Sequence, residues 1–201
     1  MKEIVINIEG EIGQYNNTVE AIQKEIVPYS GIALKVIVNI RSTGGLLDEA
    51  LKIYDYLHWL SELPDIVVET RCFGYTASCG TIIAQSASPN MRGISEHSLY
   101  LIHCCTCDIE TGNYIELGKQ RDILMLRDEH ISKIYAKHSR GILDEQAVIE
   151  IMGENKGDGY WQEPSEVIYH GLADFIITPD SSESNKGKSC NLFAKIKRLF
   201  V

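Results

Sequence analysis

The sequence predicts an α/β domain built from repeated strand–helix–strand units. Segments with strand propensity alternate along the chain with segments whose apolar residues recur at helical spacing. Residues 34–40, LKVIVNI, are almost wholly apolar, as expected for a parallel strand covered on both faces. Glycine and polar residues follow several strands, so the loops at the strand ends should carry the polar features.

The first half of the chain provides three strands and two helices. Residues 4–10 form a strand that ends in glycine, and Asn17 and Thr18 then offer an N-cap for a helix. That helix has four apolar positions at helical spacing: Val19, Ile22, Ile26 and Val27. After strand 34–40, a second helix has one continuous apolar stripe: Leu46, Leu47, Ala50, Leu51, Tyr54 and Leu57. Residues 65–71 are the next strand.

The second half begins with a turn over residues 74–80 and a short buried helix over 81–87. A strand over residues 98–102 then leads directly into His103. A long, polar-rich helix follows over Tyr114–His138, with four residues expected to face inward: Leu117, Leu124, Ile131 and Ile134. Asp144 and Pro164 each open a short helix, and residues 171–177 form the last strand.

Composition fits one folded domain with a tail. The chain has 201 residues, of which 44% are hydrophobic and 23% charged, and no apolar run approaches the length of a membrane span. Its net charge of −9 argues against a general nucleic-acid binder, which needs a basic surface. The N-terminus does not have the pattern of a signal peptide, so we expect a cytoplasmic protein.

The C-terminal segment differs in charge from the rest. Residues 181–201 hold five basic residues and one acidic residue, a net +4, which leaves −13 for residues 1–180. We therefore divide the chain into a domain over 1–179 and a flexible linker with a basic amphipathic segment over 180–201. Five apolar residues share one face of that segment: Leu192, Phe193, Ile196, Leu199 and Phe200. We expect it to dock on protein, with membrane attachment through acylation of Cys190 as the alternative.

The six cysteines predict neither disulfides nor a metal. Without an export signal a disulfide framework is not expected. The cluster His103-Cys104-Cys105-Thr106-Cys107 is the one candidate metal site, but it has no second pair of ligands elsewhere in the chain. We expect no metal and no cofactor.

Three features together indicate acyl-transfer chemistry. Ser78 lies among small residues where a strand meets a helix, in GYTASCG; Gly44 and Gly45 end a buried strand; and His103 ends another. Each alone is commonly structural: helix packing, an ordinary strand–helix turn, or a structural histidine. Together they supply a nucleophile, an oxyanion donor and a base.

These motifs resemble the ClpP-type serine endopeptidase family, which has a crotonase-like fold, over residues 3–178. The family's strand-then-glycine opening appears as VINIEGEIG, its glycine loop as RSTGG, its tyrosine-bearing helix as IYDYL and its nucleophile turn as GYTASCG. Its base motif appears as LIH, and its closing segment runs from Trp161 to GLAD. Ser78 and His103 also have the family's separation. One departure is Thr43, where the family usually has proline.

The resemblance implies roles for individual residues. Ser78 would be the nucleophile and His103 the general base, with the backbone N–H groups of Gly45 and Cys79 as the oxyanion hole. The chain edge at Gly44, Gly45 and Leu46 would bind the peptide substrate by β-augmentation. The family's aspartate falls on Gly159, so Asp158 is the expected third triad member and Glu154 the second candidate. The Cys79 thiol is the alternative nucleophile.

The resemblance also implies assembly into heptameric rings, stacked in pairs through the long helix. We do not find the segment that forms axial pore loops in bacterial members, which argues against docking to a Clp ATPase. The short start and the GYW…GLAD ending are closer to shortened phage members associated with head maturation. Three alternatives stay open: an inactive structural subunit, a crotonase-type acyl-CoA enzyme that would use carboxylates, and a binding scaffold.

Overall fold

The computed structural model describes residues 1–108 and 111–178. Its centre is a five-stranded parallel sheet in the order β1-β2-β3-β5-β7, beside a parallel pair formed by β4 and β6. This arrangement confirms the α/β class predicted from the sequence. The strands are β1 (Lys2–Glu9), β2 (Leu34–Arg41), β3 (Ile66–Cys72), β4 (Tyr75–Ala77), β5 (Arg92–Ser95), β6 (Leu99–Leu101) and β7 (Phe175–Ile177).

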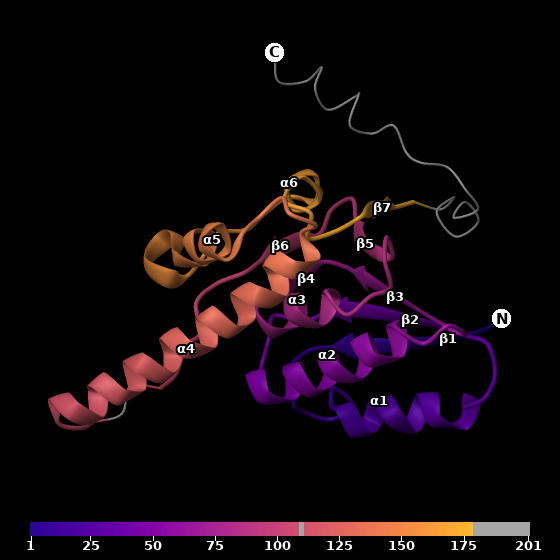
Figure 1. The fold of residues 1–201 in the computed structure, drawn as a ribbon, viewed down its shortest axis with the longest axis horizontal. Coiled ribbons are helices and arrows are strands. Elements are labelled where there is room, and N and C mark those ends of the chain that lie inside the picture. Colours follow the sequence, from indigo (N-terminus) through magenta and orange to yellow (C-terminus); the bar gives the residue numbers. More distant parts are fainter. Residues whose placement is uncertain (109–110, 179–201) are drawn as a thin grey trace, which may run out of the picture.

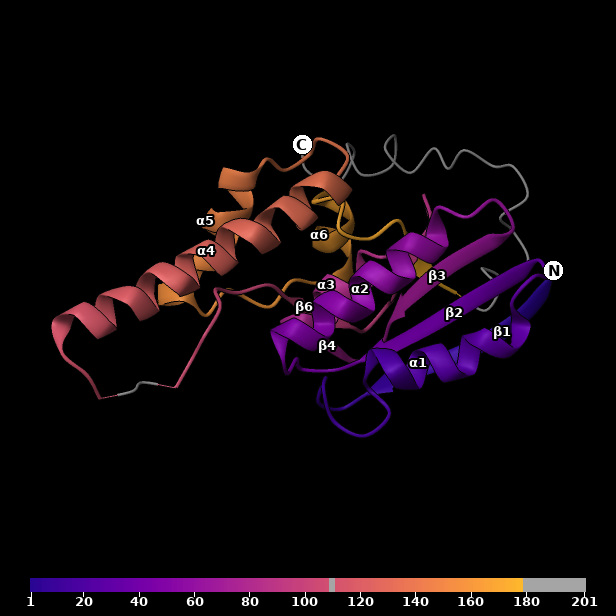
Figure 2. The same ribbon diagram turned by 60° about the horizontal axis from the view of Figure 1, so that its bottom comes forward.

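Helices α1 and α2 lie along one side of the sheet, and α4 projects away from it (Figures 1 and 2). The helices are α1 (Val19–Ile26), α2 (Leu47–Ser61), α3 (Cys79–Ala84), α4 (Tyr114–His138), α5 (Glu145–Gly157) and α6 (Pro164–Tyr169), with a short 3₁₀ helix at Val27–Tyr29. Thr18 caps α1 as predicted, its hydroxyl accepting the Ala21 N–H. None of the helices in the described ranges combines the length and apolar character that crossing a bilayer requires.

The core lies between the sheet and its helices. The register of β1 and β2 places Ile8 beside Ile40, and both side chains are fully buried. On α2, Ile53 and Leu57 are equally buried in the same cluster. Burial of such side chains stabilises the fold by about 1.5–3 kcal/mol each. Because Ile8 and Ile40 lie near the ends of β1 and β2, their packing also fixes the position of the loops that follow these strands.

Several predicted boundaries were wrong. The turn predicted over 74–80 contains strand β4, because Tyr75 and Ala77 pair with Leu99 and Leu101. Strand β5 was missed, since its four residues show no alternation. Helix α3 begins at Cys79 rather than at 81 and ends at Ala84, and the last strand covers only Phe175–Ile177.

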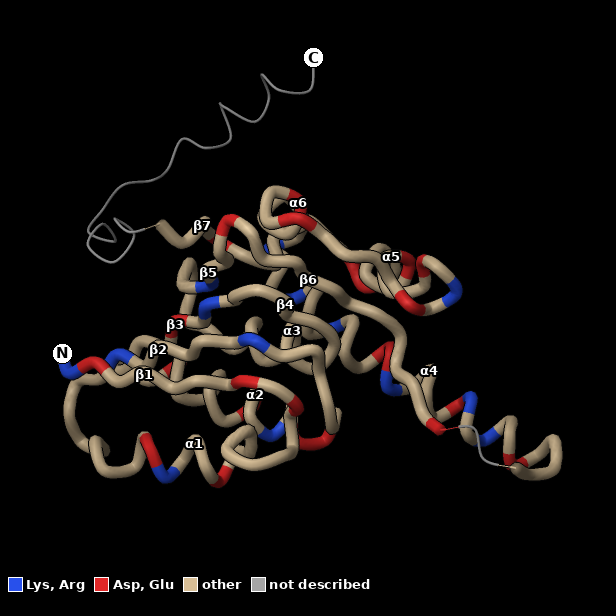
Figure 3. Tube along the Cα trace, turned by 180° about the vertical axis from the view of Figure 1, so that it is seen from behind, with Lys and Arg blue, Asp and Glu red and all other residues tan. Residues whose placement is uncertain are grey.

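The bounds of α4 match the prediction, whereas its inward face does not. Asn113 and Glu116 form a capping box at its start, which defines the helix locally. Ile131 and Ile134 are buried as expected, but Leu117 is 43% exposed because the first turns of α4 extend beyond the sheet and its helices. Acidic and basic residues alternate along the projecting part (Figure 3). On α2, Leu46 is likewise exposed, since it caps the helix instead of joining its apolar stripe.

Candidate active site

A glycine pair after β2 forms one wall of the site. The Ile12 N–H donates to Gly44 O at 2.9 Å, and the Leu46 N–H donates to Ile12 O at 3.0 Å. Because successive residues of an extended chain point their backbone groups in opposite directions, the N–H and C=O of Gly45 face away from Ile12. The Gly45 N–H makes no hydrogen bond within residues 1–108 and 111–178. A Cβ on Gly45 would lie 2.2 Å from Ile12 O, so only glycine fits there.

Ser78 occupies the junction of β4 and α3 in a strained backbone conformation. Its φ of 53° and ψ of −128° are values that a residue with a side chain rarely adopts. The Ser78 N–H donates to Leu101 O at 2.9 Å, which ties the junction to β6. A Cβ on Gly44 would lie 2.7 Å from Ser78 Cβ and 3.0 Å from its Oγ. The missing side chain at position 44 therefore leaves room for the serine hydroxyl.

His103 follows β6 and is half-buried. Its Nδ1 lies 2.6 Å from Cys104 O. A carbonyl oxygen only accepts hydrogen bonds, so Nδ1 carries a proton, and in the neutral tautomer that has this bond Nε2 is the nitrogen with the lone pair. The segment that carries His103 is held from two sides: the Cys104 N–H donates to Gly157 O at 3.0 Å, and the Cys105 N–H donates to Asp128 Oδ1 on α4 at 2.6 Å.

Ser78 and His103 line one pocket of about 500 Å³, which also includes Gly45, Leu46 and Cys79. The pocket has an apolar side formed by Leu47, Leu51, Ile82 and Ile131. In the described residues no hydrogen bond joins the Ser78 hydroxyl to His103. The structure thus brings these predicted site residues to one cavity with room for a substrate side chain.

The expected third carboxylate does not contact the histidine. Asp158 is exposed and caps the end of α5, and no bond to His103 is formed by Asp158 or Glu154 within the described chain. The backbone of this loop nevertheless packs on the histidine segment: a Cβ on Gly159 would lie 2.1 Å from Ile102 O. A side chain at position 159, where the resemblance predicted the family's aspartate, would require the loop to move. The role of Asp158 therefore stays a prediction.

The cysteines around the pocket are held as neutral thiols. Burial raises the pKa of Cys79, whose Sγ donates to Gly45 O at 3.3 Å. Burial, with Asp128 beside them, raises the pKa of Cys105 to about 12 and that of Cys104 to about 11. Because the thiolate is the reactive form of cysteine, the raised pKa of Cys79 favours Ser78 over Cys79 as the nucleophile. No group of three or more metal-ligating side chains occurs in the described ranges.

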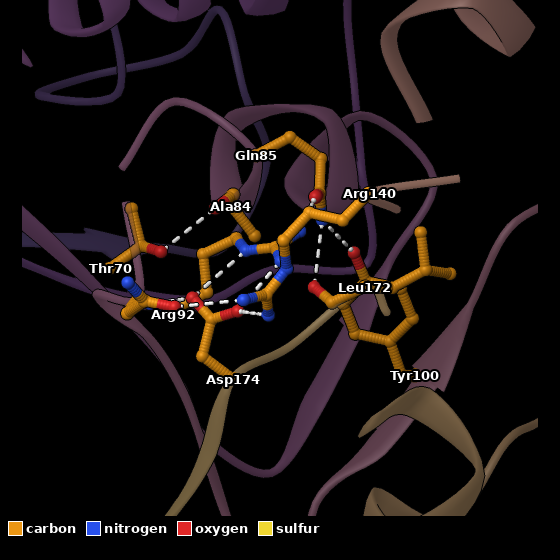
Figure 4. A network of polar contacts seen from close by, with 9 residues as sticks. Thr70, Ala84, Gln85, Arg92, Tyr100, Arg140, Leu172 and Asp174 are labelled. Carbon is orange, nitrogen blue, oxygen red and sulfur yellow. Dashed lines mark hydrogen bonds and ion pairs between the residues drawn. The ribbon is translucent and has the colours of Figure 1, made fainter. Parts of the chain in front are cut away.

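A buried polar network holds the far end of α3 (Figure 4). Arg92 donates from Nε and Nη2 to the Asp174 carboxylate at 3.1 and 2.7 Å, and from Nη1 to Gln85 Oε1 at 2.6 Å. Gln85 Nε2 donates to the Tyr100 hydroxyl at 2.9 Å, and that hydroxyl donates to Thr81 O at 3.2 Å. The network links β5, β6 and the start of β7 to the helix that follows Ser78.

Sequence reasoning missed two parts of the site. Tyr135, which lines the pocket, and Asp128, which binds the segment after His103, were both read only as parts of a long helix. No local sequence pattern marks either residue as part of the site, because the periodicity of a long helix does not predict which of its residues contact a distant loop.

The strained serine, the glycine wall and the strand-end histidine are residue types that acyl transfer can use. The chain belongs to the Clp protease family, whose model matches residues 1–180. It is similar to the ATP-dependent Clp protease proteolytic subunit 2 of Chlamydia pneumoniae, with 29% identity over 76% of this chain and 69% of that protein. The subunit of the same name from Chlamydia trachomatis serovar D is 28% identical over 76% of this chain and 68% of that protein. The family resemblance seen in the motifs is thereby confirmed.

Proposed function

We propose that this protein is a serine endopeptidase that cleaves peptide bonds through an acyl-enzyme formed on Ser78. The observation that carries the proposal is the strained backbone of Ser78 (φ 53°), held against Gly44 and open to the pocket that His103 also lines. Strain at a single non-glycine residue between a strand and a helix is typical of an exposed nucleophile. Membership of the Clp protease family supports the same reaction.

In this mechanism Ser78 Oγ attacks the substrate carbonyl while His103 Nε2 takes the serine proton. The proton on Nδ1, bonded to Cys104 O, keeps the imidazole in the tautomer that this step needs. Negative charge on the tetrahedral oxygen is stabilised by the N–H groups of Gly45 and Cys79. The Cys79 N–H is available because the first N–H groups of a helix have no acceptor within it, and the Gly45 N–H is available because it faces away from Ile12. His103 then protonates the leaving amine, and water, deprotonated by His103, releases the acyl group.

Substrate binds as an extended strand along Gly44, Gly45 and Leu46. The Gly45 C=O, which also faces away from Ile12, accepts a substrate N–H, while the Gly45 N–H serves the tetrahedral oxygen. The apolar side of the pocket takes one substrate side chain. Backbone pairing reads little of the substrate sequence, so cleavage should tolerate many sequences.

Labelling with a fluorophosphonate tests the proposal. Mass spectrometry of the labelled wild-type chain should find the adduct on Ser78, and Ser78→Ala should abolish both labelling and peptide cleavage. Cys79→Ala is the matched control and should keep both. Cleavage by Ser78→Ala at the wild-type rate would refute the assignment and favour the neighbouring thiol.

An inactive structural subunit is the second candidate function. The observation that favours it is that no carboxylate contacts His103 within the described residues. A chain of this kind would assemble normally but show neither labelling nor turnover, so the same experiment separates the two.

We also propose that the chain forms an oligomeric chamber of stacked heptameric rings. The projecting part of α4 supports this, because several large apolar side chains there are more than half exposed: Tyr114, Ile115, Met125 and Leu126. Mass photometry of the full chain measures the assembly. The tail, residues 180–201, lies outside the described residues; truncation after Asp180 should leave cleavage intact and change assembly or partner recruitment.

A further inference from the structure

Helix α4 reaches the nucleophile through two side-chain hydroxyls. The Tyr135 hydroxyl lies 2.6 Å from Thr81 Oγ1, and Thr81 Oγ1 donates to Ser78 O at 2.5 Å. Both side chains are almost fully buried, Tyr135 at 1% and Thr81 at 0% exposure. No water separates groups at these distances, so the contacts are direct hydrogen bonds.

The direction of both bonds follows from the number of protons available. A carbonyl only accepts, so the single proton of Thr81 Oγ1 is donated to Ser78 O. Thr81 Oγ1 must then accept the proton of Tyr135. Burial raises the pKa of Tyr135, which keeps that phenol protonated and able to donate. The Thr81 N–H also donates to Ser78 O at 2.9 Å, so one carbonyl receives two bonds from one residue.

That carbonyl belongs to the same peptide unit as the Cys79 N–H. Because a peptide unit is planar and rigid, any force that orients Ser78 O also orients the Cys79 N–H, which points the opposite way. The unit follows a residue with φ 53° and ψ −128°, a conformation that the surroundings must hold. Without the two bonds, the peptide could rotate toward a less strained geometry.

We propose that Tyr135, acting through Thr81, is a positioning residue that aims the Cys79 N–H at the oxygen of the reacting carbonyl. The inference rests on the proposed serine mechanism and adds α4 to it. Tyr135 touches neither the reacting atoms nor the oxyanion; it polarises the Thr81 hydroxyl, which strengthens the bond to Ser78 O. The loss should therefore appear in the step that develops negative charge, and substrate binding should change little.

Tyr135→Phe in the full chain tests this inference, since it removes one oxygen and keeps the ring that packs in the pocket. We expect kcat for a fluorogenic peptide to fall about tenfold with KM within about twofold, because one hydrogen bond is worth about that factor. The rate of fluorophosphonate labelling of Ser78 should fall by the same factor, since phosphonylation also places charge on an oxygen in the hole. Tyr54→Phe is the matched control: it removes a hydroxyl that joins α2 to His138 on α4 and that makes no hydrogen bond to Thr81 or Ser78 in the described residues, so it should leave both rates unchanged.

Position 81 gives an independent measurement if Tyr135→Phe folds poorly. Thr81→Ser keeps the hydroxyl and should retain most of kcat, whereas Thr81→Val keeps the shape and should lose at least as much as Tyr135→Phe. The double variant Tyr135→Phe/Thr81→Val should be no slower than Thr81→Val alone, because the two hydroxyls act in series.

Three results would overturn the inference. Wild-type labelling and kcat in Tyr135→Phe, with Ser78 labelled normally, would remove the role of Tyr135 and leave the serine mechanism standing. Equal losses of kcat and labelling rate in Tyr135→Phe and Tyr54→Phe would show that the Tyr135 hydroxyl acts only through the general packing of α4. Absence of labelling in the wild-type chain would refute the serine mechanism, and the positioning role with it.

Discussion

Asp174→Asn should destabilise the fold more than any surface change of similar size. The Asp174 side chain is 4% exposed and accepts from the Arg92 side chain and from the Arg92 N–H, the latter at 2.9 Å. The Asp174 carboxylate also accepts a hydrogen bond from Nη2 of Arg140, whose side chain is 55% exposed. The substitution keeps the shape, removes the charge and turns one acceptor into a donor that faces the guanidinium.

The expected size follows from the burial of both partners. Arg92 has a side-chain exposure of only 7%, so the loss of Asp174 leaves a cation inside the protein without its counter-ion. Breaking such a pair costs about 3–5 kcal/mol in the free energy of unfolding, whereas an exposed pair is worth about 0–1 kcal/mol. For a domain of this size the buried loss should lower Tm by roughly 10 °C.

Urea unfolding at one fixed protein concentration measures this effect, because assembly would otherwise shift the apparent stability. Arg140→Gln is the control and should cost at most about 1 kcal/mol, since it removes the exposed partner of the same carboxylate. A loss under about 1 kcal/mol for Asp174→Asn, with an unchanged m-value, would refute the view that this network holds the far end of α3.

Three further predictions concern the site and pH. Gly44→Ala should lower kcat/KM and Ser78 labelling at least about a hundredfold, because its Cβ would lie 2.7 Å from Ser78 Cβ; Gly118→Ala, which has nothing within 4 Å, is the control, and equal activities would contradict the reasoning. Asp158→Asn should lower kcat with little change in KM, and a fully active variant would indicate a Ser78–His103 dyad or a role for Glu154. Burial, aided by the nearby cations of Arg92 and Lys137, lowers the pKa of His138 to about 4, so the folded state prefers the neutral ring. Stability from this residue should be complete above about pH 6.5, the ordinary pKa of histidine, and decline by at most about 1.4 kcal/mol for each pH unit as the pH falls toward 4. His138→Gln should flatten that part of a urea-unfolding pH series, and an unchanged slope would contradict the prediction.

The sequence predicted most helices and strands because their signals are local. The capping residues Thr18 and Asp144 mark helix starts through bonds to the backbone N–H three positions further along the chain. The apolar run of residues 34–40 defines β2 without reference to the rest of the chain. Strand β4 was missed because a segment as short as Tyr75–Ala77 becomes a strand only through pairing with a partner, here Leu99–Leu101.

By itself, the sequence determined the α/β class, the family and the candidate residues Ser78, His103 and Gly45, since these rest on residue types in a fixed order. Tertiary structure alone decided that Gly44 lies against Ser78, that Asp158 is exposed and that Tyr135 bonds to Thr81, 54 residues away. The physical reason is that a hydrogen bond or a close approach depends on where two distant segments meet. That position is set by packing of the whole core, and no short pattern contains it.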